Sequence, residues 1–204
     1  MAGRATYHHG DLKAALVAAG VRAAREGGEA AVGLNRLAAG LGVSASAAYR
    51  HFPEGLEDLL VAVGDVARRR LTERLVLRIS EVAPSGDAAT DARRRFRASG
   101  RAYVEYVLEE PGLFQVANRH DRGRLPDADP FGVLESCIAD LVRVGVLEEA
   151  RRTDTATAAW AAVHGLAVLL TEGPLRRLPP DRRDRAVEST LDMVEAALRS
   201  RPAP

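Results

Sequence analysis

Apolar side chains recur at three- and four-residue steps along almost the whole of this 204-residue chain. That spacing places them on one face of a helix, whereas a strand needs an alternation of period two, which the chain does not sustain. The pattern therefore predicts an all-α protein. The expected helices cover about residues 11–26, 34–40, 45–51, 53–82, 88–110, 111–117, 131–147, 154–172 and 181–199.

Capping residues predict where several of these helices begin and end. Asp11 can accept hydrogen bonds from the free N–H groups of the first helix, and Gly27 suits its end. Ser44 can cap the third helix in the same way. Pro53 suits the first turn of the fourth helix, where its missing N–H costs nothing. These signals divide the chain into a three-helix domain over 1–52 and a helical bundle over 53–204, with the helix 53–82 as connector.

The segment LNRLAAGLGVSASAAYRHF, residues 34–52, contains two short apolar-striped helices separated by a turn at Gly42. This pattern is typical of a helix-turn-helix, whose second helix enters the DNA major groove. The exposed face of that helix would carry small and hydroxyl side chains, together with an arginine that can pair with guanine. The candidates for DNA contact on it are Ser44, Ala45, Ser46, Tyr49 and Arg50.

Charge and cysteine content narrow the functional class. The net charge is only +1, but residues 1–52 carry six Lys or Arg and three Asp or Glu side chains, so the basic end is the better candidate for nucleic-acid contact. Cys137 is the single cysteine, which excludes an internal disulfide and fits a reducing compartment. No apolar stretch approaches the length of a signal core or a membrane span. We therefore expect a cytoplasmic protein with no membrane partner.

Three segments, YHHGDLKAAL (residues 7–16), LNRLAAGL and GVSASAAYRHF, closely resemble the TetR family of transcriptional regulators. The resemblance is specific over residues 7–60 and looser beyond, where WAAVHGL, residues 160–166, resembles the Trp-His-Gly pattern of one subgroup. It implies a three-helix DNA-binding domain, a connecting helix, and a variable helical domain that dimerises and binds a ligand. Carried over by position, it places Tyr49 and His51 at the sugar–phosphate backbone and Ala45, Ser46 and Arg50 at the bases.

Two positions depart from the family pattern. Many members open the second helix with Ser or Thr and have Arg soon after, whereas this chain has Gly33 and Asn35. Asparagine prefers adenine, and Arg36 can replace the lost charge. The lysine that often grips phosphate after the third helix is Gly55 here, close to Glu54. We therefore expect fewer phosphate contacts and weaker nonspecific DNA binding.

The C-terminal half carries a candidate effector site. Six of the nine aromatic residues lie between residues 96 and 160. A bundle can either pack them solid or leave a mainly apolar cavity with Tyr hydroxyls and one imidazole as polar anchors. The cavity would take an apolar or aromatic small molecule. The candidate lining residues are Phe96, Tyr103, Tyr106, Phe114, Phe131, Trp160 and His164.

The last two long helices carry apolar stripes that predict a homodimer. Two such helices from each subunit can form a four-helix contact, and a two-fold dimer matches a palindromic operator. The alternative is that the stripes close the core of one chain. The residues concerned are Val163, Leu166, Leu170, Val187, Leu191, Val194 and Leu198.

These features predict a ligand-responsive repressor that binds a palindromic double-stranded DNA operator as a homodimer and is released by a small-molecule effector. The alternatives are an activator, a co-repressor-dependent regulator, or a helical enzyme or interaction module. His8, His9 and Asp11 resemble metal ligands only superficially, because adjacent histidines in an arm point to different sides. No catalytic residue, metal or cofactor is expected, since nothing in the sequence brings Cys137 and His164 together.

Overall fold

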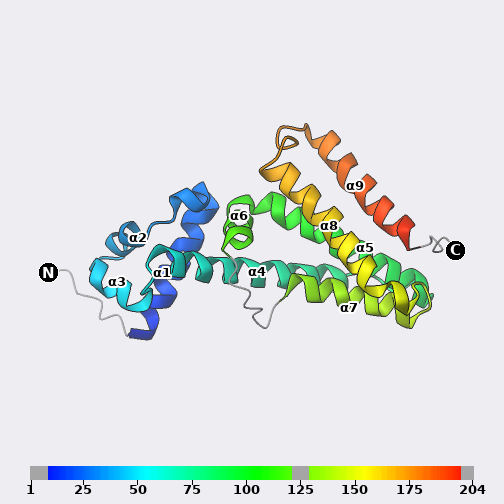
Figure 1. Cartoon of the computed structure of the whole chain (residues 1–204), viewed down its shortest axis with the longest axis horizontal. Helices are drawn as coiled ribbons and strands as arrows, with labels where there is room; N and C mark the ends of the chain where they lie inside the picture. Colours follow the sequence, from blue (N-terminus) through cyan, green and yellow to red (C-terminus); the bar gives the residue numbers. More distant parts are fainter. Residues whose placement is uncertain (1–8, 121–128, 199–204) are drawn as a thin grey trace. The chain divides into compact units, whose positions relative to one another are not determined.

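The structure, a computed structural model, describes residues 9–120 and 129–198. All regular structure in these ranges is helical, so the predicted all-α class is confirmed. None of the helices described is long and apolar enough to cross a membrane. Figure 1 shows the elements in chain order. They are α1 (His9–Gly27), the 3₁₀ turn η1 (Glu29–Ala31), α2 (Leu34–Gly40), α3 (Ala45–His51), α4 (Leu56–Ser80), α5 (Ala88–Glu109), α6 (Pro111–Arg119), α7 (Pro130–Arg143), the 3₁₀ turn η2 (Glu149–Arg151), α8 (Arg152–Thr171) and α9 (Pro180–Ala197).

The chain forms two compact units, and each draws on two separate stretches of sequence. The first unit takes its described residues from Met1–Arg68 and Glu110–Pro126, so it contains α1, α2, α3, the first half of α4, and α6. The second takes them from Arg69–Glu109 and Asp127–Pro204. The first unit extends beyond the segment 1–52 expected from the sequence, because apolar side chains of α4 and α6 complete its core.

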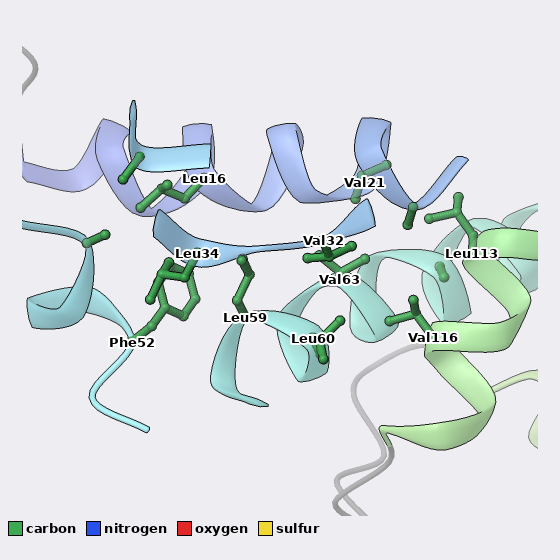
Figure 2. Close-up of a cluster of buried hydrophobic side chains, with 14 of the residues drawn as sticks. Leu16, Val21, Val32, Leu34, Phe52, Leu59, Leu60, Val63, Leu113 and Val116 are labelled. Carbon is green, nitrogen blue, oxygen red and sulfur yellow. The ribbon is translucent and has the colours of Figure 1, made fainter. Parts of the chain in front are cut away.

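The core of the first unit is built from the apolar stripes of its helices. Leu16, Leu59 and Val63 are fully buried, and Phe52, which follows α3, is buried in the same cluster. Figure 2 shows the side chains of α1, α2, α4 and α6 converging on this core, with Leu113 supplied by α6. Burying one large apolar side chain stabilises a fold by about 1.5–3 kcal/mol. These contacts therefore fix how α2 and α3 are held.

The start of α4 differs from the prediction. Helix α4 begins three residues after Pro53, because the chain first makes a turn at Gly55, whose φ is 73°. The carboxylate of Asp58 accepts a hydrogen bond from the N–H of Glu54 at 2.8 Å and so stabilises this turn. Pro53 precedes the helix instead of opening it, and the predicted start at Pro53 was wrong.

Two other helix ends also differ. Helix α1 begins at His9, so the backbone of Asp11 is already helical and Asp11 does not occupy the predicted capping position. Helix α7 ends at Arg143, four residues before the expected end at 147. Gly145 follows with a φ of 73°, a left-handed conformation that ends helices and that glycine adopts without steric cost.

The second unit packs α5 against α7, α8 and α9. Phe96 of α5 shares a buried cluster with Ile138 and Leu141 of α7. On the side toward α9, the guanidinium of Arg97 makes ion pairs at 2.7 Å with Glu188 and Asp192. Helix α5 therefore contacts all three of these helices, and α8 likewise contacts α7 and α9.

The stripes that predicted a dimer contact are buried inside the second unit itself. Leu191 of α9 is 4% exposed, Leu170 of α8 is 4% exposed, and only Val194 is more than marginally accessible. The spacing of apolar residues predicted the buried faces of α8 and α9 correctly, but these faces pack against other helices of the same chain. The prediction that these residues form the four-helix contact between subunits was therefore wrong. The other buried members are Val163, Leu166, Val187 and Leu198.

Candidate nucleic-acid interface and effector pocket

The turn between α2 and α3 is held by main-chain hydrogen bonds and one side-chain cap. Gly42 has a φ of 72°, and the N–H of Val43 then donates to the carbonyl oxygen of Ala38 at 3.0 Å. The hydroxyl oxygen of Ser44 accepts a hydrogen bond from the N–H of Ala47 at 3.2 Å. This confirms the predicted cap of α3. The two helices are thus joined by a short, capped turn.

Helix α3 has one buried and one exposed side. Ala48 is completely buried and seats the helix on the core of the first unit. His51, at the last position of α3, is half-buried, whereas the other predicted DNA contacts are exposed. The structure therefore gathers these side chains on the accessible surface of the α2–α3 pair. The exposed members are Asn35, Arg36, Ser44, Ala45, Ser46, Tyr49 and Arg50.

Arg36 has partners within the protein. Its Nη2 donates hydrogen bonds to the carbonyl oxygens of Ala31 at 2.7 Å and Ala30 at 3.3 Å. The guanidinium is therefore turned back toward η1 in this structure. To contact phosphate, Arg36 would have to use its remaining N–H groups or break these two hydrogen bonds.

The surface of α2 and α3 is free of negative charge. Residues 34–52 contain no Asp or Glu. Lys13, exposed on α1, places its Nζ 5.9 Å from the ring centroid of Phe52, which brings another cation beside the end of α3. Sequence reasoning did not select Lys13, although its position on the polar face of α1 was a usable signal. Lysine and arginine are the side chains that neutralise phosphates in protein–DNA contacts, so exposed Lys13 and Arg50 both suit that role.

Gly55 has a structural role that the resemblance to the family pattern did not predict. A Cβ at this position would lie 3.2 Å from Cε1 of Tyr49, and the backbone φ is positive. A side chain here would therefore be strained and would press on the Tyr49 ring. Glycine in place of lysine allows Tyr49 to lie over the turn before α4.

Helix α6 is joined to α1 by apolar and polar contacts. A Cβ on Gly112 would overlap the carbonyl oxygen of Ala24, so only glycine permits this approach. Glu110 pairs with Arg25, whose Nε donates to Oε2 at 2.7 Å. Oε1 of Gln115 accepts a hydrogen bond from the N–H of Glu29 at 3.2 Å.

The far end of α6 contacts α4 and η1. The guanidinium of Arg68 donates to the carbonyl oxygen of Ala117 at 2.8 Å. His120, the C-cap residue of α6, lies against Glu57 of α4 and Glu29 of η1 at 3.1 Å each. Helix α6 is therefore tied at both ends to elements that carry α2 and α3.

Four of the predicted effector residues form one cluster in the second unit. Trp160 makes edge-to-face contacts with Tyr103 and Phe131, with ring centroids 5.2 and 5.4 Å apart. His164 stacks on Trp160 at 5.7 Å, and its Nδ1 forms a 2.8 Å hydrogen bond with the Tyr103 hydroxyl. Such aromatic pairs stabilise a core beyond the area they bury.

The cavity beside this cluster is small, about 30 Å³. Phe96, Tyr103 and Trp160 line it, while Tyr106, Phe131 and His164 are not among its walls. A drug-sized ligand needs roughly 300–1,000 Å³, so in this conformation the aromatic side chains are packed almost solid. An effector could enter only with movement of the surrounding helices.

Phe114 is the one predicted effector residue that lies in the first unit. It is buried in α6, which is part of the first unit, and it does not line the cavity. The aromatic residues were grouped by their nearness in sequence, but the chain passes from one unit to the other between α5 and α6. Its role in effector binding stays a prediction.

Burial sets the protonation states of the cluster. Desolvation raises the pKa of Tyr103, so its hydroxyl stays protonated, and desolvation lowers the pKa of His164. The imidazole is therefore neutral at pH 7. An uncharged phenol and an uncharged imidazole are polar anchors that do not select for a charged ligand.

Two protein-family models match the chain. Residues 16–63 match bacterial regulatory proteins of the tetR family, and residues 96–194 match the tetracyclin repressor-like C-terminal domain. The chain belongs to the TetR family of transcriptional regulators. As a TetR-family regulator it carries a DNA-binding helix-turn-helix, which is the α2–α3 pair described above. The Trp-His-Gly resemblance of residues 160–166 stays a prediction.

Solved structures share this TetR-family fold over nearly the full chain. A protein of unknown function from Rhodococcus sp. RHA1 is 26% identical, with a TM-score of 0.69, and the match covers 97% of this chain and 100% of that one. A protein from Mesorhizobium loti MAFF303099, described as a TetR-family transcriptional regulator, is 14% identical, with a TM-score of 0.56 and coverage of 94% and 98%. A transcriptional regulator from Rhodococcus sp. Rha1 is 20% identical, with a TM-score of 0.51 and coverage of 93% and 99%. A search of curated proteins found no match.

The sequence of this TetR-family regulator also raised a cysteine thiol and possible metal ligands as chemical groups. Burial raises the pKa of the Cys137 thiol to about 11, so it stays protonated at neutral pH and is a poor nucleophile. Within residues 9–120 and 129–198, no cluster of His, Cys, Asp or Glu could hold a metal ion. His8 and the side chains of His9 and Asp11 lie outside the described residues.

Proposed function

We propose that the protein is a ligand-responsive repressor that binds a palindromic DNA operator as a dimer and releases it when a small apolar or aromatic molecule binds. The observation that carries this proposal is the exposed, acid-free surface of α2 and α3, with Arg50 and Tyr49 on α3. Arg50 would read a guanine, and Tyr49 with His51 would contact the backbone. Its site of action would be chromosomal DNA in the cytoplasm.

The dimer would form through the outer faces of α8 and α9, whose inner faces are already buried. Met193 on α9 is 64% exposed and Leu169 on α8 is 41% exposed, and both are apolar. Small side chains accompany them, and Gly165 on α8 has open space where a Cβ would lie. A groove of about 440 Å³ between the two helices is lined by Ala158 and Met193. Small and apolar residues on two adjacent helices allow close packing against a second copy.

The effector would act by stabilising an expanded form of the second unit. Because the cavity holds only about 30 Å³, a ligand of useful size must bind a conformation in which the helices around Trp160 have separated. DNA affinity then falls only as far as the ligand prefers that conformation over the DNA-bound one. A ligand that prefers the DNA-bound form would instead make the protein a co-repressor-dependent regulator.

A mobility-shift titration of the purified full-length protein tests the proposal. The probes are a double-stranded palindrome selected by the protein from a randomised pool and a scrambled duplex of the same composition. Specific, salt-sensitive binding of the palindrome is expected. Equal binding of both duplexes would contradict sequence-specific regulation. A transcription assay on the bound promoter, with and without the protein, distinguishes repression from activation.

A further inference from the structure

His120 bridges two carboxylates that come from different parts of the first unit. Its Nδ1 forms a hydrogen bond with Glu57 of α4, at 3.1 Å from Oε2. Its Nε2 lies 3.1 Å from Oε1 of Glu29 in η1, close enough for strong electrostatic attraction although not aligned as a hydrogen bond. The imidazole side chain is only 13% exposed. A single ring thus holds α6, η1 and α4 together.

The two carboxylates flank the DNA-reading helices in the sequence. Glu29 lies in η1, just before α2, and Glu57 lies in the first turn of α4, just after α3. The stretches of chain on either side of the DNA-reading segment, residues 34–52, are therefore both held by one side chain at the end of α6. A substitution of His120 therefore changes how the chain is anchored before α2 and after α3, and it leaves the exposed side chains of α2 and α3 unchanged.

The strength of this bridge depends on the protonation of the ring. A protonated imidazole carries N–H groups on both nitrogens and one positive charge, which suits two carboxylates. A neutral ring has one N–H, so one carboxylate then faces a nitrogen lone pair. Burial lowers the pKa of His120, but the hydrogen bond to Glu57 and the carboxylate of Glu29 outweigh burial and raise it above the ordinary value.

Other charged groups lie around the bridge. Nη1 of Arg119 lies 3.4 Å from Oε2 of Glu29. On α4, Arg68 is paired with Asp65 at 2.6 Å. Arginines keep their charge at all pH values at which the protein is folded, and carboxylates are ionised above about pH 5. Histidine is the side chain whose ordinary pKa lies nearest to neutral pH.

We propose that His120 is a proton-dependent positioning residue for the DNA-reading helices: when protonated it fixes both ends of residues 34–52 on α6, and DNA affinity falls as it loses its proton. This inference rests on the proposed DNA-binding function. The bridge is complete below about pH 6.5, the ordinary pKa of histidine, and is lost as the pH rises through the raised pKa of the folded protein.

An experiment without DNA tests the bridge itself. The titration of His120 in the full-length protein is followed by NMR, with assignment from the spectrum of His120→Gln. Glu57→Gln should lower the pKa of His120, whereas Glu26→Gln, which removes an exposed carboxylate on α1, should leave it unchanged. The difference in melting temperature between wild type and His120→Gln should shrink as the pH rises from 6 to 9. A His120 pKa that Glu57→Gln leaves unchanged would overturn the bridge.

DNA binding tests the positioning role. The probe is the palindrome selected by wild type at pH 6.5, and its affinity is compared at pH 6.5 and 8.5 at fixed salt. Wild type should lose about fivefold more affinity over this interval than His120→Gln or Glu57→Gln, a factor typical of coupling between sites. Equal losses in all three proteins would overturn the inference while leaving the proposed function intact. Absence of specific binding by wild type at both pH values would instead contradict the proposed function.

Discussion

Gly112 of α6 lies so close to the carbonyl oxygen of Ala24 in α1 that a methyl group on Gly112 would overlap it. The nearby Cα of Gly28 is 3.2 Å from the same position, so backbone surrounds the site and cannot give way as a flexible side chain would. This approach lets Leu113 reach the core of the first unit. The packing of α6 on α1 thus depends on a residue with no side chain.

Gly112→Ala should therefore destabilise the first unit by about 1–3 kcal/mol, the usual cost of overpacking a core. Gly40→Ala is a matched control, because Gly40 is the last helical residue of α2 and a Cβ there would meet nothing within 4 Å. The control should be neutral or stabilise by up to about 1 kcal/mol. Denaturant unfolding followed by circular dichroism measures both. Equal stability of the two variants would contradict the close packing of α6 on α1.

Arg50→Ala and Tyr49→Ala should have different effects on DNA binding. If Arg50 meets a guanine, its loss relaxes base preference by about 1–3 kcal/mol at one position of the operator. Loss of Tyr49 should weaken binding to all sequences alike, because a backbone contact carries no sequence information. Selection from a randomised duplex pool, followed by titration of matched and mismatched sites, separates the two effects. If both variants bound DNA as wild type does, the assignment of α3 as the DNA-reading helix would be wrong.

The sequence predicted those features of the fold and the site that depend on residues only a few positions apart. The cap of α3 by Ser44 and the exposure of Arg50 follow from spacing within a few residues, and both are found. The period of the Leu191 stripe showed that one face of α9 is buried, but a period carries no information about which surface covers that face. Likewise, Phe114 was grouped with Tyr103 by nearness in sequence, although the chain changes unit between α5 and α6. The bridge at His120 joins residues far apart in sequence and gave no local signal.

The stability of the second unit should fall in mild acid because of His164. Burial lowers the pKa of His164 in the folded protein below the unfolded value, so below about pH 6.5 the unfolded state binds more protons than the folded state. Stability is therefore full above that pH and declines as the pH falls toward the lowered pKa. His164→Gln should flatten this decline between pH 7 and 5, measured by thermal unfolding monitored through Trp160 fluorescence. A decline as steep in the variant as in wild type would exclude His164 as its source.

The dimer and the core of the second unit should respond to different substitutions. Met193→Asp, alone or with Leu169→Asp, places charge on exposed apolar positions and should yield a folded monomer. Leu191→Asp places a charge inside the bundle and should unfold the second unit, at a cost above about 4 kcal/mol. Light scattering reports the mass and circular dichroism the helix content. A dimer that survives both outer substitutions would show that another surface joins the subunits.

Gly100 offers a way to close the effector site without touching the reading helices. It lines the cavity, and a Cβ there would lie 2.8 Å from Cδ2 of Leu191, the flexible end of a side chain. Gly100→Ala should therefore keep the fold and fill part of the 30 Å³ cavity, which leaves less room for a ligand beside Trp160. The ligand is an aromatic compound that quenches Trp160 fluorescence and releases the operator from wild type. Releasing the operator from the variant should require a concentration at least about tenfold higher, which corresponds to a loss of about 1.4 kcal/mol in the free energy of ligand binding. Operator binding without ligand should stay at the wild-type level, because α2 and α3 belong to the first unit. If the compound released both proteins at the same concentration, its binding site would lie outside this cavity.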